Sequence, residues 1–297
     1  GGYYITSNVA NDRIACSETK DATAIYYFDG SHLLAYTTGL YFGLNANDWT
    51  FEAVGSDDIS AIEFVAAANG AEEKYNIKSG GRWLHLSANS DGSTFVNRCS
   101  ANTCGNAHNW AIETVEALPV TITAAKYATF YAPVAVEVPE GVTAYTATVD
   151  AANNRVELNE IGGVIPANTG VVLYSDIEEA TTYNFAITED VEAVEGNALR
   201  GSAAATYYTT AGTYYALGLV EGEVGFYKDA FNNSRFQNNS HKAYLYVEGT
   251  QNAASYSFRF EGGTTGINEV KTENGEVKAI FDLTGRRVET INEAGIY

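Results

Sequence analysis

The chain has 297 residues, of which 45% are apolar, and it carries a net charge of −20 with an isoelectric point near 4.4. This length predicts more than one domain. The acidic surface repels phosphate groups and so disfavours nucleic acids and anionic membranes as partners, and no apolar run reaches the roughly 20 residues of a membrane-spanning helix.

Short β-branched and aromatic runs, separated by Gly, Asn and Asp, recur along the whole chain. This spacing is typical of β-strands joined by tight turns, and few stretches show helical periodicity. The sequence therefore predicts an all-β protein with strands near residues 24–28, 32–36, 61–67, 73–79, 120–124, 170–174, 242–247 and 255–260.

The first third of the chain contains a repeat. The phrase NANDWTFEAV at residues 45–54 returns as NAHNWAIETV at 106–115, and Gly39–Phe42 returns as Gly81–Leu84. A hairpin unit of roughly 40 residues cannot bury its own apolar face, so its copies must share one core. Alternating apolar residues follow Trp49 and Trp110, which predicts that both indoles are core residues.

Residues 1–117 resemble a ricin-type β-trefoil, whose repeats end in a Q-x-W motif. The matching residues are Asn47-Asp48-Trp49 and His108-Asn109-Trp110, with Asn or His in place of Gln. The stretch GGYYITSNVANDRIACSE at the N-terminus is interpreted as the remnant of a third copy. The resemblance implies a pseudo-threefold domain of the kind that binds sugars.

Sugar-binding sites of this family combine an aspartate, an aromatic ring and an asparagine within one repeat. The ring packs against the C–H face of the sugar, and the polar groups bind its hydroxyls. The nearest matches in this chain are two groups of residues, although turn and core roles would also explain each member. The candidate ligand-binding residues are Tyr27, Asp29, His32 and Tyr36 in one copy, and Trp83, His85, Asn89 and Asp91 in the other.

A shift in composition at Glu116-Ala117-Leu118-Pro119 marks a second domain, expected over residues 118–263. Its phrases ATFYAPVAVEVPEGVTAYTA and IGGVIPANTGVVLY resemble a module of secreted Bacteroidetes proteins, and we expect a β-sandwich. The polar stretch DAFNNSRFQNNSHK at 229–242 is expected to be a long loop that forms a binding edge or a mobile connection.

Residues 264–297 form the third expected domain, which begins within a GGTTG linker at residues 262–266. The segment AIFDLTGRRV, followed by GIY, resembles the C-terminal modules of secreted Bacteroidetes proteins, including type IX sorting domains. That pattern normally continues past a G-I-Y strand, so we expect a partial β module. The chain contains no methionine, which predicts that Gly1 is not the native start.

Cys99 and Cys104 lie close together in RCSANTC, and this spacing predicts a disulfide. Two alternatives remain: Cys16 pairs with either of them, or it stays a buried thiol. No zinc-binding or calcium-binding motif occurs, so the sequence predicts no metal and no cofactor.

Taken together, the resemblances imply a non-catalytic carbohydrate-binding accessory region of a secreted or cell-surface bacterial protein. Its partners would be a glycan and an upstream catalytic or adhesin domain of the same polypeptide, most simply within a larger glycan-active enzyme. One alternative is a structural spacer or surface-adhesion segment without a small ligand. Another is a hydrolase whose paired carboxylates, about 5–9.5 Å apart, leave no mark in the sequence.

Overall fold

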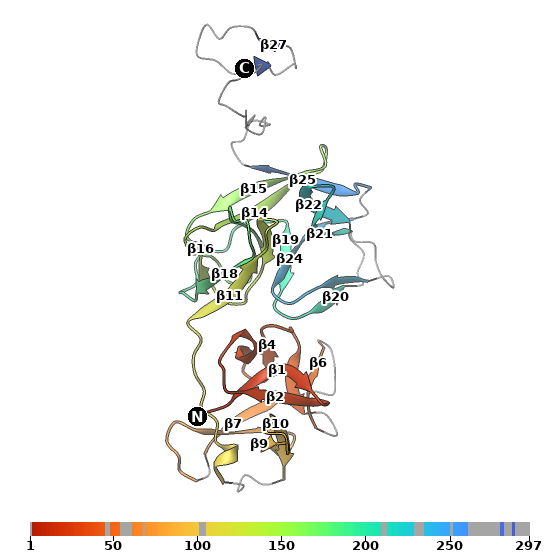
Figure 1. Ribbon diagram of the computed structural model, residues 1–297. Helices are drawn as coiled ribbons and strands as arrows, with labels where there is room; N and C mark the ends of the chain where they lie inside the picture. The colour runs from red at the N-terminus through yellow and green to blue at the C-terminus, as the bar shows by residue number, and fades with distance from the viewer. Residues whose placement is uncertain are drawn as a thin grey trace.

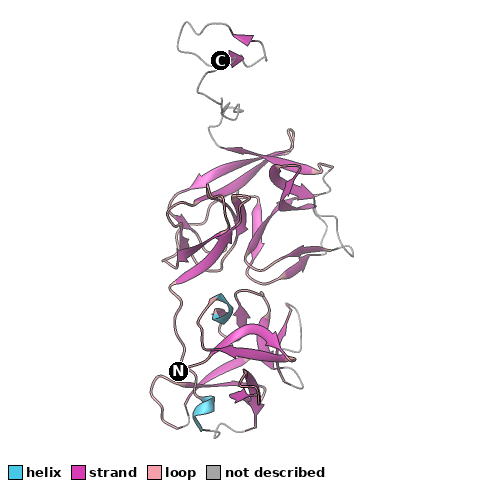
Figure 2. Cartoon of the chain, viewed as in Figure 1, coloured by secondary structure: helices cyan, strands magenta, loops and turns pink. Residues whose placement is uncertain are grey.

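The computed structural model describes residues 2–44, 48–53, 61–67, 69–100, 105–208, 213–228, 235–249 and 252–260, together with the backbone of 280–281 and 287–288. These residues form strands joined by turns and two short 3₁₀ helices, η1 (Ala22–Ala24) and η2 (Gly105–His108). The predicted all-β class is confirmed (Figure 2). No helix in the described part of the chain has the length and apolar character needed to cross a membrane.

Figure 1 shows two bodies placed end to end. We call residues 2–110 the first unit and residues 117–260 the second unit; the extended segment 111–116 connects them. Strands β1 to β10 pair only with one another, and so do strands β11 to β25.

The first unit contains a six-stranded and a four-stranded antiparallel sheet. The six-stranded sheet has the order β1-β2-β10-β9-β8-β7 and is built from β1 (Tyr4–Ala10), β2 (Arg13–Ser17), β7 (Ile62–Ala66), β8 (Tyr75–Ser79), β9 (Arg82–Ala88) and β10 (Thr94–Cys99). The four-stranded sheet joins β3 (Tyr26–Phe28), β4 (Leu33–Ala35), β5 (Tyr41–Leu44) and β6 (Trp49–Glu52) in chain order.

One apolar core lies between these two sheets. Trp49 lies on β6, whereas Trp110 forms a β-bridge with Tyr75 of the other sheet, and the two indoles are only 3% and 8% exposed. The prediction that both are core residues is confirmed. The other buried members of this core are Ile14, Phe42, Leu44, Ile62, Ile77, Leu84 and Val96. The pseudo-threefold trefoil arrangement remains a prediction.

The second unit is dominated by one nine-stranded sheet with the order β12-β17-β14-β15-β25-β22-β21-β24-β19. The pair β15–β25 is parallel and the other pairs are antiparallel. Its strands are β12 (Tyr127–Phe130), β14 (Thr143–Asp150), β15 (Arg155–Ile161), β17 (Val171–Tyr174), β19 (Leu199–Ser202), β21 (Thr213–Val220), β22 (Glu223–Lys228), β24 (Lys242–Val247) and β25 (Ser255–Phe260).

This sheet curls until its two ends meet. The Tyr131 N–H, just past the end of β12, donates to the carbonyl of His241, just before β24. Two-stranded ribbons complete the unit: β11 (Ala117–Ile122) with β18 (Thr181–Ala186), β13 (Val136–Glu137) with β16 (Val164–Ile165), and β20 (Thr206–Tyr208) with β23 (Phe236–Asn238). Curling encloses apolar residues from strands distant in sequence, including Leu118, Phe130 and Phe185. The description of this unit as a β-sandwich remains a prediction.

The stretch 229–242 is not a simple loop. Phe236 is 1% exposed and lies on β23, and Asn238 Nδ2 donates to Ser202 Oγ and to the carbonyl of Lys242. Phe236 therefore belongs to the core and not to a binding edge. Residues 229–234 lie outside the described residues.

The predicted C-terminal module lies largely outside the described residues as well. Within it, β26 (Ile280–Phe281) pairs antiparallel with β27 (Arg287–Val288). The partial β module expected for residues 264–297 stays a prediction.

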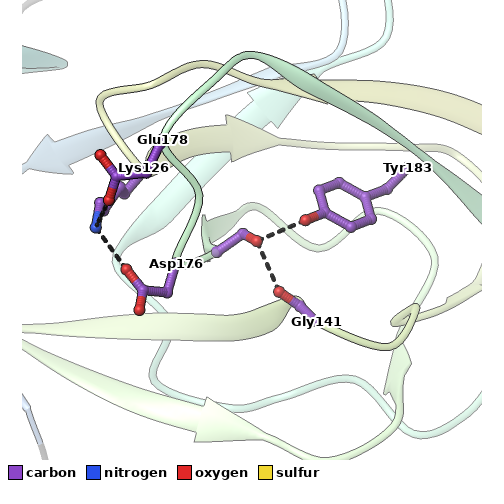
Figure 3. A network of polar contacts seen from close by, with 6 residues as sticks. Lys126, Gly141, Asp176, Glu178 and Tyr183 are labelled. Carbon is purple, nitrogen blue, oxygen red and sulfur yellow. Dashed lines mark hydrogen bonds and ion pairs between the residues drawn. The ribbon is translucent and has the colours of Figure 1, made fainter.

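A buried hydroxyl ties three segments of the second unit together (Figure 3). Ser175 Oγ, in a residue that is 2% exposed, donates to the carbonyl of Gly141 at 2.7 Å and lies 2.7 Å from the Tyr183 hydroxyl. On the other side of the same loop, Lys126 pairs with Asp176 and Glu178 in a solvent-exposed cluster. The Asp176 carboxylate, through its hydrogen bond, raises the pKa of Lys126, so its ammonium stays charged and is not a nucleophile.

We expect Ser175→Ala to lower the free energy of unfolding by about 1–3 kcal/mol, because Gly141 and Tyr183 lose a buried partner. Urea unfolding followed by circular dichroism measures this loss. Lys126→Met is the matched control, and its midpoint should stay near wild type, since exposed ion pairs contribute little. A wild-type midpoint for Ser175→Ala would contradict the role given to this hydroxyl.

Candidate functional site

A cavity of about 450 Å³ opens on the first unit, beside the β1–β2 hairpin and the turn that joins β9 to β10. This volume lies within the range of small-ligand sites. The side chains that line it include two aromatic rings, two amides, a thiol and a carboxylate, namely Tyr3, Phe95, Asn11, Asn89, Cys16 and Glu18. Such a mixture offers both a packing surface and hydrogen-bonding groups.

Tyr3 and Glu18 come together because β1 and β2 are antiparallel, which places the start of one strand beside the end of the other. The Glu18 carboxylate accepts a hydrogen bond from the Tyr3 phenol and raises its pKa. The phenol therefore stays protonated and remains a donor. Among the described residues that line the cavity, Glu18 supplies the carboxylate.

The turn between β9 and β10 contributes another part of the lining, and hydrogen bonds among the side chains of the turn fix its conformation. Asn89 Nδ2 donates to Ser93 Oγ at 2.9 Å, and Asp91 Oδ1 accepts hydrogen bonds from Ser93 Oγ and Ser93 N–H. The bonds from the Ser93 hydroxyl and then from the Ser93 N–H lower the pKa of Asp91. Asn89, Gly92 and Ser93 line the cavity, so this turn presents polar groups to it in a fixed conformation.

Phe95 and Cys16 form the more apolar part of the lining. Phe95 is 6% exposed, and the guanidinium of Arg13 lies over its ring, 4.3 Å from the ring centre. Burial raises the pKa of the Cys16 thiol to about 12, so it is protonated and a weak nucleophile at neutral pH. Cys16 thus contributes a small apolar surface.

Trp83 and His85, the other two members of the second predicted group, lie along β9 and not in the cavity. Their side chains alternate with buried Leu84, which faces the core. The Lys78 ammonium lies 5.9 Å from the centre of the Trp83 ring, and the His85 ring lies 5.0 Å from that of His108. The predicted group is therefore divided: Asn89 lines the cavity, Asp91 supports its turn, and Trp83 and His85 lie elsewhere.

The first predicted group is also divided. Asp29 and His32 form an exposed turn, in which Asp29 Oδ1 accepts the N–H groups of Ser31 and His32. Burial acts to raise the pKa of Asp29, but hydrogen bonds from His32 and Ser31 outweigh it and lower the pKa. This geometry explains both residues as turn formers.

Tyr27 and Tyr36, by contrast, face the second unit. The Tyr36 hydroxyl donates to the carbonyl of Pro119 at 2.8 Å, and the ring of His241 lies 4.4 Å from Tyr36 and 5.3 Å from Tyr27. Burial raises the pKa of both phenols. We call this contact the junction; it consists of Tyr27 and residues 36–39 of the first unit against Pro119, Ala205, Ser240 and His241 of the second.

The predicted Cys99–Cys104 disulfide cannot be followed, because Cys104 lies outside the described residues; Cys99 ends β10. Cys16 is a free thiol. In the described part of the chain, no three His, Cys, Asp or Glu side chains gather in a way that could hold a metal ion.

Sequence reasoning singled out Asn89 but missed Tyr3, Asn11, Cys16 and Glu18 as companions. All four lie in the stretch interpreted as the remnant of a third copy, where no pattern indicated a binding site. Their meeting with Asn89 depends on the β2–β10 pairing, which no local pattern reveals.

Comparisons of this chain with family models, with curated proteins and with solved structures give no match.

Proposed function

We propose that this chain is a non-catalytic carbohydrate-binding region of a secreted or cell-surface bacterial protein, and that the glycan binds in the cavity of the first unit. The observation that carries this proposal is the cavity itself, with Tyr3 and Phe95 beside Asn11, Glu18 and Asn89. In the larger protein, we propose that the region holds an upstream catalytic or adhesin domain close to its glycan.

The chemistry of the lining supports a sugar over other small ligands. A pyranose presents apolar C–H groups, which pack on an aromatic ring, and hydroxyls, which both donate and accept hydrogen bonds. Its binding site therefore needs an aromatic ring together with amides and a carboxylate. The net charge of −20 disfavours anionic ligands. A neutral glycan is not repelled by this charge.

The same lining favours binding over hydrolysis. Retaining and inverting glycosidases need two facing carboxylates, whereas the described lining of this cavity holds the single carboxylate of Glu18. The Glu18 carboxylate also accepts a hydrogen bond from the Tyr3 phenol, which fixes its position as a hydrogen-bond acceptor for a ligand.

A glycan array probed with the full chain tests the proposal, followed by calorimetry on the best ligand. We expect Tyr3→Ala and Asn89→Ala each to weaken binding about three- to tenfold, because each removes a contact worth about one hydrogen bond. The matched controls are Tyr207→Ala, an exposed tyrosine of the second unit, and Asn153→Ala, a hairpin-turn asparagine. Both controls should retain wild-type affinity.

Cys16 offers a second measurement that locates the ligand. Alkylation of Cys16 is slow because its pKa is raised, and a bound glycan should slow it further, read by peptide mass spectrometry after long exposure to excess reagent. A blank array, or binding that both control variants weaken equally, would contradict the proposal. Release of reducing ends from polysaccharide would instead identify a hydrolase.

A structural spacer is the second candidate function, and the junction favours it. The first unit contacts the second through hydrogen bonds from Ala205 N–H to the carbonyl of Gly39 and from Ser240 Oγ to the carbonyl of Tyr36. Such a contact suits a chain that holds its neighbours at a set separation. A blank glycan array combined with an intact junction would favour this function.

A further inference from the structure

The junction closes on a histidine that has no charged partner. His241 is 6% exposed, and its Nδ1 lies 2.9 Å from the carbonyl of Tyr131, which makes Nδ1–H the donor and leaves the neutral ring's Nε2 as an acceptor. Nε2 is buried without a hydrogen-bond partner, beside the rings of Tyr27 and Tyr36. The neutral imidazole fits this site.

The backbone around His241 leaves the ring little freedom. The His241 N–H donates to the carbonyl of Ser202, and its own carbonyl accepts the Tyr131 N–H. The preceding residue, Ser240, reaches across the junction to the carbonyls of Tyr36 and Thr37. A positive charge on the His241 ring therefore destabilises the contact between the two units directly.

The described groups that face His241 cannot balance a positive charge on it. They are the phenols of Tyr27 and Tyr36, each with a pKa raised by burial, the backbone carbonyl of Tyr131 and the ammonium of Lys242. A phenol ring attracts a cation and offsets part of the cost, but Lys242 repels it and burial removes its hydration. A protonated Nε2–H would also point at aromatic carbon and not at an acceptor.

We propose that the junction is an acid-sensitive lock: it holds the two units as one body at neutral pH and releases them when His241 is protonated. Opening exposes the ring to water, where both nitrogens can donate. The covalent link through residues 111–116 stays intact, and the core around Trp49 is untouched. Opening also separates Tyr27 and Tyr36 from the apolar core of the second unit, against which both pack in the closed state. The lock stands independently of the proposed glycan site.

The pH window follows from the pKa of His241. Burial lowers this pKa from 6.5 to about 4 in the closed state. A lowered histidine pKa means that the closed state has its full stability above pH 6.5 and loses it as the pH falls toward 4. With these two pKa values, the ratio of open to closed chains rises by about 20-fold between pH 7 and pH 5.

Amide hydrogen exchange on the full chain tests the lock. The Ala205 N–H, bonded to the carbonyl of Gly39, reports junction opening, and the Tyr75 N–H, bonded to the carbonyl of Trp110 inside the first unit, is the internal control. After correction for intrinsic exchange rates, the opening constant of Ala205 should rise by about 20-fold from pH 7 to pH 5, while that of Tyr75 stays constant. Equal protection of Ala205 at both pH values, or a parallel loss at Tyr75, overturns the proposal.

Two variants separate the lock from general instability. Asn suits the positive φ of 53° at position 241 and supplies an N–H for the carbonyl of Tyr131, so His241→Asn should abolish the pH dependence and keep the junction. Tyr36→Phe loses the bond to Pro119 and should raise opening at every pH while keeping a response of about 20-fold. A persistent acid response in His241→Asn contradicts the assignment to this ring.

Discussion

Replacement of Trp49 by alanine is expected to lower the free energy of unfolding of the first unit by about 3–5 kcal/mol, the range found when large core side chains are truncated. The indole is 3% exposed and stacks on Phe42, with ring centres 5.2 Å apart and planes inclined by 10°. Its removal opens a cavity in the core that both sheets share. Because a small domain has only about 5–15 kcal/mol of stability in total, the unit should be close to unfolding. Urea unfolding followed by circular dichroism measures the loss.

Trp83→Ala is the matched control for this prediction. Trp83 is half-buried and lies on the face of β9 away from the core, so its removal should cost clearly less than that of Trp49. Trp49→Phe should recover part of the loss by refilling the space. Equal midpoints for the two alanine variants would mean that the core does not depend on Trp49.

The second large effect is expected from Gly39→Ala. Gly39 has a φ of +63°, and an added Cβ would overlap both the backbone nitrogen of Ala205 and the Cβ of Ser240. The left-handed conformation costs a non-glycine residue about 1–2 kcal/mol, and overpacking adds about 1–3 kcal/mol. The chain can relieve the clash by opening the junction, so we expect the Ala205 amide to lose protection while the cores of both units persist.

Gly163→Ala isolates the backbone part of this effect. Gly163 has a nearly equal φ of +66°, and a Cβ added there would meet no other atom within 4 Å. This variant should incur only the conformational cost and leave Ala205 protected from exchange. If both variants behave alike in thermal unfolding and in exchange at Ala205, the close approach at Gly39 does not hold the units together.

The fold class and the two core indoles could be predicted because their signals are local. Alternating apolar residues and aromatic runs specify strands and their buried faces wherever the strands pair. The repeated phrase placed Trp49 and Trp110 in one core. It did not show that the two would lie in different sheets, since that depends on pairing partners such as Tyr75.

The candidate residues were harder to predict because a turn former and a ligand-binding residue look alike in sequence. Asp29 and Asn89 both precede a glycine turn, yet Asn89 lines a cavity while Asp29 binds its own turn. Tyr36 resembles a stacking platform until the second unit covers it. The surroundings decide between these roles, and they come from other strands.

From its sequence alone this protein is determined to be all-β and acidic, with tryptophans inside the first unit, because composition and period-two patterning act over a few residues at a time. Only the tertiary structure decided where Tyr3 meets Asn89 and where Tyr36 meets His241. Those meetings arise when hairpins pair and a nine-stranded sheet curls until its ends touch. The residues that meet are far apart along the chain, so the local preferences of the sequence do not predict their contact.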